Sequence, residues 1–143
     1  MTNVFLTKLG ATGAHVWSRG FGGGPVGVTV DRRGRTKMLG SFGTTPPALS
    51  AGGVTAAPLT CAGDQNLYVA SFDLAGAYRW SLCAGTAGGT LRGGAIASDP
   101  SGNVFAVGDY KTASSVAFPQ AAGGQLVLPR NGSTDTFLVK ISP

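Results

Sequence analysis

The sequence predicts an all-β protein made of repeated antiparallel hairpins, and three observations lead to this. Glutamate is absent from the 143 residues and only 12% of them are charged, against about 25% in an average domain. Helix-rich soluble proteins use glutamate heavily. Short apolar segments are separated by glycine-containing turns, as in β-hairpins. Finally, the chain resembles itself at long intervals, which is the signature of a repeat architecture.

The first repeated unit is a hairpin whose strands are the third and fourth of each period. Segment 3–23, "NVFLTKLGATGAHVWSRGFGG", aligns with segment 66–86, "NLYVASFDLAGAYRWSLCAGT", at an offset of 63 residues, as from Trp17 to Trp80. The closing "TDTFLVKISP" aligns with the same strands, with Phe137 at the place of Tyr68. The chain therefore ends on the kind of strand with which it begins.

The second repeated unit supplies the first and second strands. The segments "VTVDRRGRTKMLGSF" and "AIASDPSGNVFAVGDY" align at an offset of 68 residues, as from Asp31 to Asp99. The first strands, "VGVTV" and "GAIAS", are small and apolar. Long connections, 43–65 and 111–134, follow the second strands, and "NLYVASF" alternates between two faces. Each period thus contains four short strands joined largely by tight turns.

Four-stranded antiparallel sheets repeated around an axis are the blades of a β-propeller. Small first strands suit the crowded axis, and the bulkier aromatic residues fall on the third and fourth strands. We therefore expect a partial β-propeller of about two blades in one segment, 1–143. Residues 1–23 supply the third and fourth strands of one blade, 24–87 a complete blade, and 88–143 a blade without its last strand. A closed propeller needs roughly 4–8 blades, so we expect either a piece of a larger propeller or a subunit that self-associates.

The motifs quoted above, together with "LTCAG" in the first connection, resemble the bacterial β-propeller repeat called SBBP. Typical members carry a "TDxFLxKLDxxGxxxWSxxFGG" segment, which "TDTFLVKISP" and "NVFLTKLGATGAHVWSRGFGG" match closely. The departures are Asp64–Gln65 and the two cysteines. The resemblance implies a secreted or cell-envelope bacterial protein and brings no catalytic residues, although the opening residues show no signal-peptide pattern.

Cys61 and Cys83 lie in the same period and are not related by the repeat. Because the third and fourth strands form a hairpin, Cys61 falls within loop reach of Cys83. A disulfide would restrain the long connection and indicate an oxidising compartment; two buried free thiols are the alternative. A zinc site is not expected, because there is no CxxC motif and only one histidine.

Trp17 and Trp80 occupy equivalent repeat positions, and two interpretations are open. They could stack on a sugar, as in a lectin, or pack between neighbouring blades as a repeated core requires. His15 has no serine–acid motif around it and is expected to be an ordinary strand residue. Asp31, Asp73 and Asp99 recur at turns, where aspartate bonds its own backbone; a calcium loop would need more oxygen ligands.

The predicted function is a non-catalytic propeller scaffold that presents loops to an unknown protein or glycan ligand. The long connections are the candidate binding loops. The alternatives are a lectin-like carbohydrate-binding propeller that uses Trp17 and Trp80, or a piece of a propeller enzyme whose active site lies in other blades. No cofactor, metal, nucleic acid or membrane insertion is expected: the arginines of "VDRRGRTK" read as a solvated turn, and no apolar run is long enough to span a bilayer.

Overall fold

The computed structural model describes residues 3–120 and 124–142. These residues form β-strands and no helix, which confirms the all-β prediction. The strands are β1 (Asn3–Leu9), β2 (His15–Gly22), β3 (Gly24–Val30), β4 (Thr36–Phe42), β5 (Asn66–Phe72), β6 (Tyr78–Ala84), β7 (Thr90–Ser98), β8 (Val104–Lys111), β9 (Ser115–Pro119), β10 (Gln125–Pro129) and β11 (Asp135–Ile141). A helix long and apolar enough to cross a lipid bilayer does not occur in the described part of the chain.

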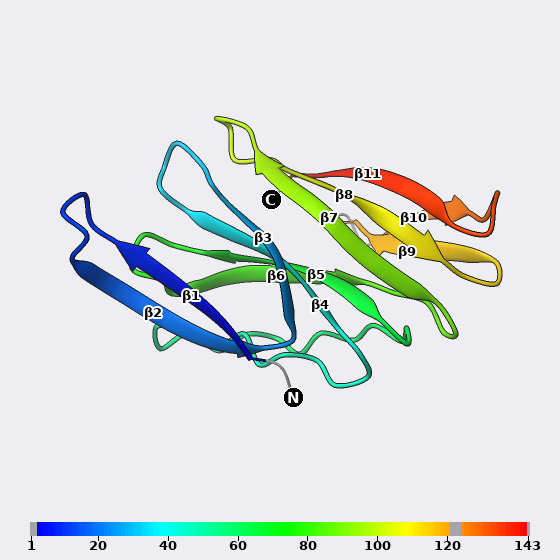
Figure 1. Ribbon diagram of the computed structural model, residues 1–143, viewed down its shortest axis with the longest axis horizontal. Helices are drawn as coiled ribbons and strands as arrows, with labels where there is room; N and C mark the ends of the chain where they lie inside the picture. Colours follow the sequence, from blue (N-terminus) through cyan, green and yellow to red (C-terminus); the bar gives the residue numbers. More distant parts are fainter. Residues whose placement is uncertain (1–2, 121–123, 143) are drawn as a thin grey trace.

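The strands pair into antiparallel sheets, and every neighbour follows its partner in sequence except β11, which pairs with β8 (Figure 1). β1 and β2 form the first sheet, and β3–β4–β5–β6 form a four-stranded second sheet in sequence order. In the third sheet β8 lies between β7 and β11. The small hairpin β9–β10 is a separate two-stranded sheet in the connection between β8 and β11. Below, β1–β2 is called the first sheet, β3–β4–β5–β6 the second sheet and β7–β8–β11 the third sheet.

Four tight turns share one geometry. In each, the fourth residue is a glycine with positive φ, and its N–H bonds the carbonyl of the first residue. The first N–H in turn bonds the carbonyl of the fifth residue. This is the three-residue hairpin loop in which glycine adopts the left-handed conformation. The four turns are Gly10–Ala14, Asp31–Arg35, Asp73–Ala77 and Asp99–Asn103.

The first and second sheets pack face to face across what we call the first core. Val4 and Phe21 of the first sheet meet Tyr68 and Phe72 of β5, and the rings of Phe21 and Phe72 are stacked with centroids 5.1 Å apart. Leu49 of the long connection closes the same core. The first sheet and the long connection 43–65 together cover this face of the second sheet.

The second and third sheets pack across a second core, which lies on the other face of β5. Leu67 and Val69 alternate with the residues of the first core and meet Ala106, Phe137 and other side chains of the third sheet. Every residue of β5 is consequently buried. The second sheet is the middle layer, and each of its faces has its own partner sheet.

A glycine faces an aromatic ring across the strand pair in the same place in both larger sheets. Gly40 of β4 pairs with Tyr68, and Gly108 of β8 pairs with Phe137. A Cβ added to either glycine would collide with the ring, so each ring lies flat on its neighbouring strand. Burial raises the pKa of Tyr68 to about 12. Its hydroxyl finds no hydrogen-bond partner among the described residues, while the equivalent Phe137 carries no hydroxyl.

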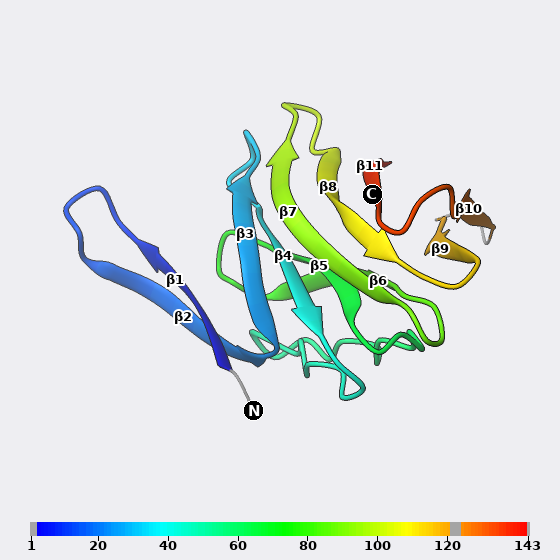
Figure 2. The same ribbon diagram turned by 45° about the vertical axis from the view of Figure 1, so that its right-hand side comes forward.

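The two small apolar strands, β3 and β7, are the first strands of their sheets and lie side by side (Figure 2). Thr29 Oγ1 and Ser98 Oγ are 2.9 Å apart. A Cβ on Gly27 would lie 3.1 Å from Ile96 Cγ2. Small side chains at these positions thus allow adjacent sheets to converge along this edge.

The long connections differ from the loops that the sequence predicts. Residues 111–134 contain the hairpin β9–β10, which places Val116 and Phe118 in the second core. In connection 43–65, Leu49 and Leu59 are buried in the first core. Both connections therefore contribute side chains to the hydrophobic interior, one to each core.

Candidate functional site

The candidate binding site is a cleft of about 740 Å³ at the end of the first and second sheets. Its walls are Asn3, Gln65 and the segments 22–24 and 41–48. These are the crossing from β2 to β3, the end of β4 and the beginning of the first long connection. The structure thus places part of one predicted binding loop on a concave surface.

The crossing from β2 to β3 requires glycine. Gly23 has a φ of 99°, in the left-handed region that side chains disfavour. A Cβ on Gly23 would lie 2.7 Å from the carbonyl oxygen of Ser41. The chain therefore passes close against β4 and forms one wall of the cleft from backbone groups.

Asn66 holds the two ends of the connection that forms the other wall. Its side chain is fully buried. Its Nδ2 donates to the carbonyls of Gly43 at 2.8 Å and Gly63 at 2.9 Å, and its Oδ1 accepts the Gly63 N–H at 2.7 Å. One amide thereby ties the start of the connection to its end. From sequence, Asn66 looked like an ordinary first residue of a strand.

The cleft is chemically neutral. Among the residues that line it there is no acid, base or cysteine, and its side-chain polar groups are hydroxyls and amides, such as those of Thr44, Thr45 and Gln65. Such groups donate and accept hydrogen bonds without titrating near neutral pH. The arrangement can bind an uncharged polar ligand, and it supplies no nucleophile–base pair.

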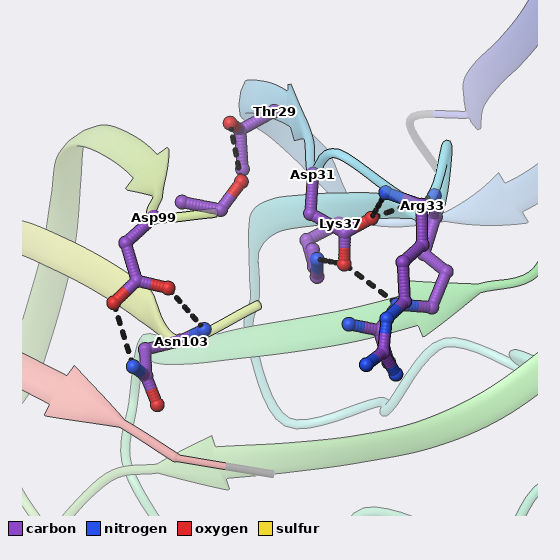
Figure 3. Close-up of polar contacts among 8 residues, drawn as sticks. Thr29, Asp31, Arg33, Lys37, Asp99 and Asn103 are labelled. Carbon is purple, nitrogen blue, oxygen red and sulfur yellow. Dashed lines mark hydrogen bonds and ion pairs between the residues drawn. The ribbon is translucent and has the colours of Figure 1, made fainter. Parts of the chain in front are cut away.

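The acidic turns form a second polar cluster, on the side of β3 and β7 (Figure 3). Asp31 is buried, and its Oδ1 accepts the N–H groups of Arg33 and Arg35 at 2.9 and 3.1 Å. Its Oδ2 accepts from Arg35 Nε at 2.6 Å and from the buried Lys37 ammonium. Burial alone would raise the pKa of Asp31, but these hydrogen bonds outweigh it and hold the pKa well below its usual range.

Asp99 repeats the arrangement with an amide in place of the cations. Its two oxygens accept from the backbone N–H and the side-chain Nδ2 of Asn103, at 2.9 and 2.6 Å. The Asn103 amide is the main cause that lowers the pKa of Asp99. Asp73 likewise accepts the N–H groups of Ala75 and Ala77. Because these carboxylates are occupied by their own turns, they serve as structural turn residues. No group of three or more potential metal ligands occurs in residues 3–120 and 124–142.

Trp17 is buried against the turn between β5 and β6 of the second sheet. Its Nε1 donates to the carbonyl of Leu74 at 3.0 Å, and its ring lies against Gly76. Arg19 stacks on the ring, 5.6 Å from its centroid, and donates to the carbonyl of Gly76 at 2.9 Å. Trp17 is thus covered by protein and offers no open face to a sugar. Trp80 is half-buried at the edge of the second core.

Cys61 and Cys83 are joined by a disulfide, with their Cα atoms 6.1 Å apart. Cys83 lies on β6 opposite Tyr68. The bridge fastens the end of connection 43–65 to the outermost strand of the second sheet. The connection is therefore held at one end by Asn66 and near the other by both Asn66 and the disulfide.

His15 lies on the exposed side of the first sheet, away from the cleft. Its Nε2 and Ser18 Oγ are 2.8 Å apart, and Ser18 also contacts Thr7. The structure gives His15 no carboxylate partner among the described residues, and the surface around this pair is open. Arg32 and Arg33 are exposed on their turn. Sequence reasoning did not anticipate the His15–Ser18 contact. Residues three apart on a regular strand face opposite sides, but the bulge opposite Lys8 and Leu9 turns His15 to the same face as Ser18.

No protein-family model matches the chain, and a search of curated proteins found no match. The resemblance to the SBBP repeat therefore depends on the quoted motifs.

Proposed function

We propose that the chain is a segment of a non-catalytic β-propeller scaffold of the SBBP kind, from a secreted or cell-envelope bacterial protein. The supporting observation is that equivalent strands of successive sheets pack with equivalent faces: Val4 of β1 and Leu67 of β5 occupy the same repeat position and each faces the following sheet. The small first strands β3 and β7 also converge along one edge. Blades arranged around an axis have this relation. The Cys61–Cys83 disulfide fits an oxidising compartment.

The cleft next to connection 43–65 is the proposed ligand site. Its glycine backbone and neutral hydroxyl and amide groups suit an uncharged, extended polypeptide segment, which presents alternating N–H and C=O groups. No tryptophan lines it. A lectin-like role has a single remaining aromatic candidate, the half-buried Trp80.

A phage-displayed peptide library and a glycan array, both probed with the intact chain, test this function. We expect peptide binding that is abolished by Thr45→Arg, which places a bulky cation in the cleft. Thr12→Arg, on an exposed turn of the first sheet, is the matched control and should bind as the wild type does. Glycan binding that disappears with Trp80→Ala would favour the lectin instead. Binding that ignores Thr45→Arg would reject the cleft.

A further inference from the structure

We propose that the chain associates head to tail with a second copy of itself through two unlike sheet faces, one at each end of the stack. This inference rests on the repeated-sheet architecture of the proposed function. It adds a partner and a contact surface that the cleft does not involve.

The two faces of each sheet can be distinguished by direction: one is turned toward the N-terminal end of the stack and the other toward its C-terminal end. We call them the preceding-side face and the following-side face. In β5, Tyr68 and Phe72 point toward the first sheet, and Val69 points toward the third. The relative exposure of all three is 1% or less. Within this chain, therefore, the same two kinds of face meet twice.

The first sheet leaves its preceding-side face open. The repeat places Phe5 and Leu9 at the positions of Tyr68 and Phe72. Phe5 is 77% exposed and Leu9 is 58% exposed. On the same face Thr7 Oγ1 and Ser18 Oγ lie 3.1 Å apart, and His15 pairs with Leu9 at its end. We call this surface, whose apolar residues are Phe5 and Leu9, the leading face.

The third sheet leaves its following-side face open. Leu138 occupies the position of Val69 and is 71% exposed. Beside it on β8, Phe105 and Val107 are half-buried, and the Lys140 ammonium lies 5.8 Å from the centre of the Phe105 ring. We call this surface, made of Phe105, Val107 and Leu138, the trailing face.

A second copy is the occupant that these faces suit best. The trailing face of one molecule and the leading face of another reproduce the pairing that buries β5 on both sides. Because the two faces differ, the contact is heterologous and can continue from molecule to molecule. Face-to-face stacking also requires no exchange of strands, whereas joining sheet edges would place two strands of the third kind next to each other. Large apolar side chains that gather on open faces mark interaction surfaces.

Sedimentation equilibrium of the intact chain tests the proposal. We expect a mass above 14.3 kDa that rises with concentration. Phe5→Asp and Leu138→Asp should each weaken association by more than roughly a hundredfold, because each would bury a carboxylate in an apolar contact. Val127→Asp, which removes an exposed side chain of the β9–β10 hairpin, is the matched control and should associate as the wild type does.

Mixing the two variants gives the decisive result. Phe5→Asp retains a trailing face and Leu138→Asp retains a leading face, so the mixture should form a one-to-one dimer and nothing larger. A monomeric wild type would overturn the proposal, and so would a variant that still self-associates or a mixture that stays monomeric. Circular dichroism verifies that the variants are folded. Peptide binding by monomeric Phe5→Asp tests the cleft separately, so failure of association is distinguishable from failure of the proposed function.

Discussion

At the scale of the residue, Asn66 is a buried amide that satisfies three backbone groups at the two ends of one connection. We expect Asn66→Ala to lower the free energy of unfolding by about 2–4 kcal/mol, because buried groups left without partners cost about 1–3 kcal/mol each. Urea unfolding measures the change. Asn3→Ala, the exposed repeat equivalent, is the control and should be nearly neutral. Equal effects at both positions would contradict the role given to Asn66.

Asp31 makes the free energy of unfolding depend on pH in the acidic range. Burial acts to raise its pKa, but hydrogen bonds from Lys37 and Arg35 lower it further than burial raises it. A carboxyl whose pKa is lower in the folded state contributes stability above its unfolded pKa, about 3.9, and loses that contribution as the pH falls toward the folded pKa. We expect the free energy of unfolding to decrease as the pH falls below about 5.

The variant Asp31→Asn isolates this contribution. At neutral pH it should be several kcal/mol less stable, because it leaves the Lys37 ammonium buried without its counter-charge. Its stability should also change less between neutral and acidic pH than that of the wild type. Thermal unfolding over a pH series provides both quantities. A pH profile parallel to that of the wild type would show that Asp31 is not the responsible group.

At the scale of the element, the disulfide fixes a connection that has little regular structure of its own. It spans 22 residues of sequence, and a loop of that size corresponds to about 3 kcal/mol of stabilisation. We expect the double variant Cys61→Ser, Cys83→Ser to unfold at a lower urea concentration by a comparable free energy. Reductant should destabilise the wild type and leave the double variant unchanged. A wild type unaffected by reductant would contradict the bridge.

Gly93 and Gly94 are adjacent in β7 and experience different surroundings. A Cβ on Gly93 would lie 2.9 Å from the side chains of Leu39 and Leu67, whereas a Cβ on Gly94 meets nothing closer than 3.5 Å. Gly93→Ala should therefore destabilise the protein by about 1–3 kcal/mol through overpacking, and Gly94→Ala should change stability little. Chemical unfolding of both variants makes the comparison. The reverse order would mean that β7 does not lie against the second sheet.

The elements that sequence predicts well are those with local signals. The hairpin turns at Asp31–Arg35 and Asp73–Ala77 combine an aspartate with a glycine of positive φ. Apolar and polar residues alternate in the strands beside these turns. The hairpin β9–β10 was missed because it has no counterpart in the other period. Its strands are five residues long and lie in a segment rich in glycine, alanine and proline.

Other features depend on contacts between distant parts of the chain. Lys37 is buried although lysine usually is exposed, and only the position of Asp31 six residues earlier on the folded hairpin explains it. Trp17 is covered by a turn that lies 57 residues away in sequence. The cleft is formed by four separate parts of the chain, so no single motif marks it. These properties could not be read from spacing alone.

At the scale of the whole molecule, the three sheets form a stack in which both faces of the middle sheet pack against a neighbouring sheet and its strand β5 is wholly buried. The sequence repeat accounts for this stacking. Residues one period apart face equivalent partners, so the same kinds of contact recur between successive sheets. The same logic leaves the outermost faces unpaired, at Phe5 and Leu138. It also brings the small first strands β3 and β7 together along one edge.

Cross-linking of β3 to β7 tests this arrangement most directly. Thr29 Oγ1 and Ser98 Oγ lie 2.9 Å apart, so Thr29→Cys combined with Ser98→Cys should form a disulfide under mild oxidation. Peptide mapping by mass spectrometry should find it alongside the Cys61–Cys83 bridge. Thr29→Cys with Lys140→Cys, which pairs β3 with the opposite edge strand of the third sheet, is the control and should stay unlinked. A folded protein in which positions 29 and 98 do not cross-link would contradict the account.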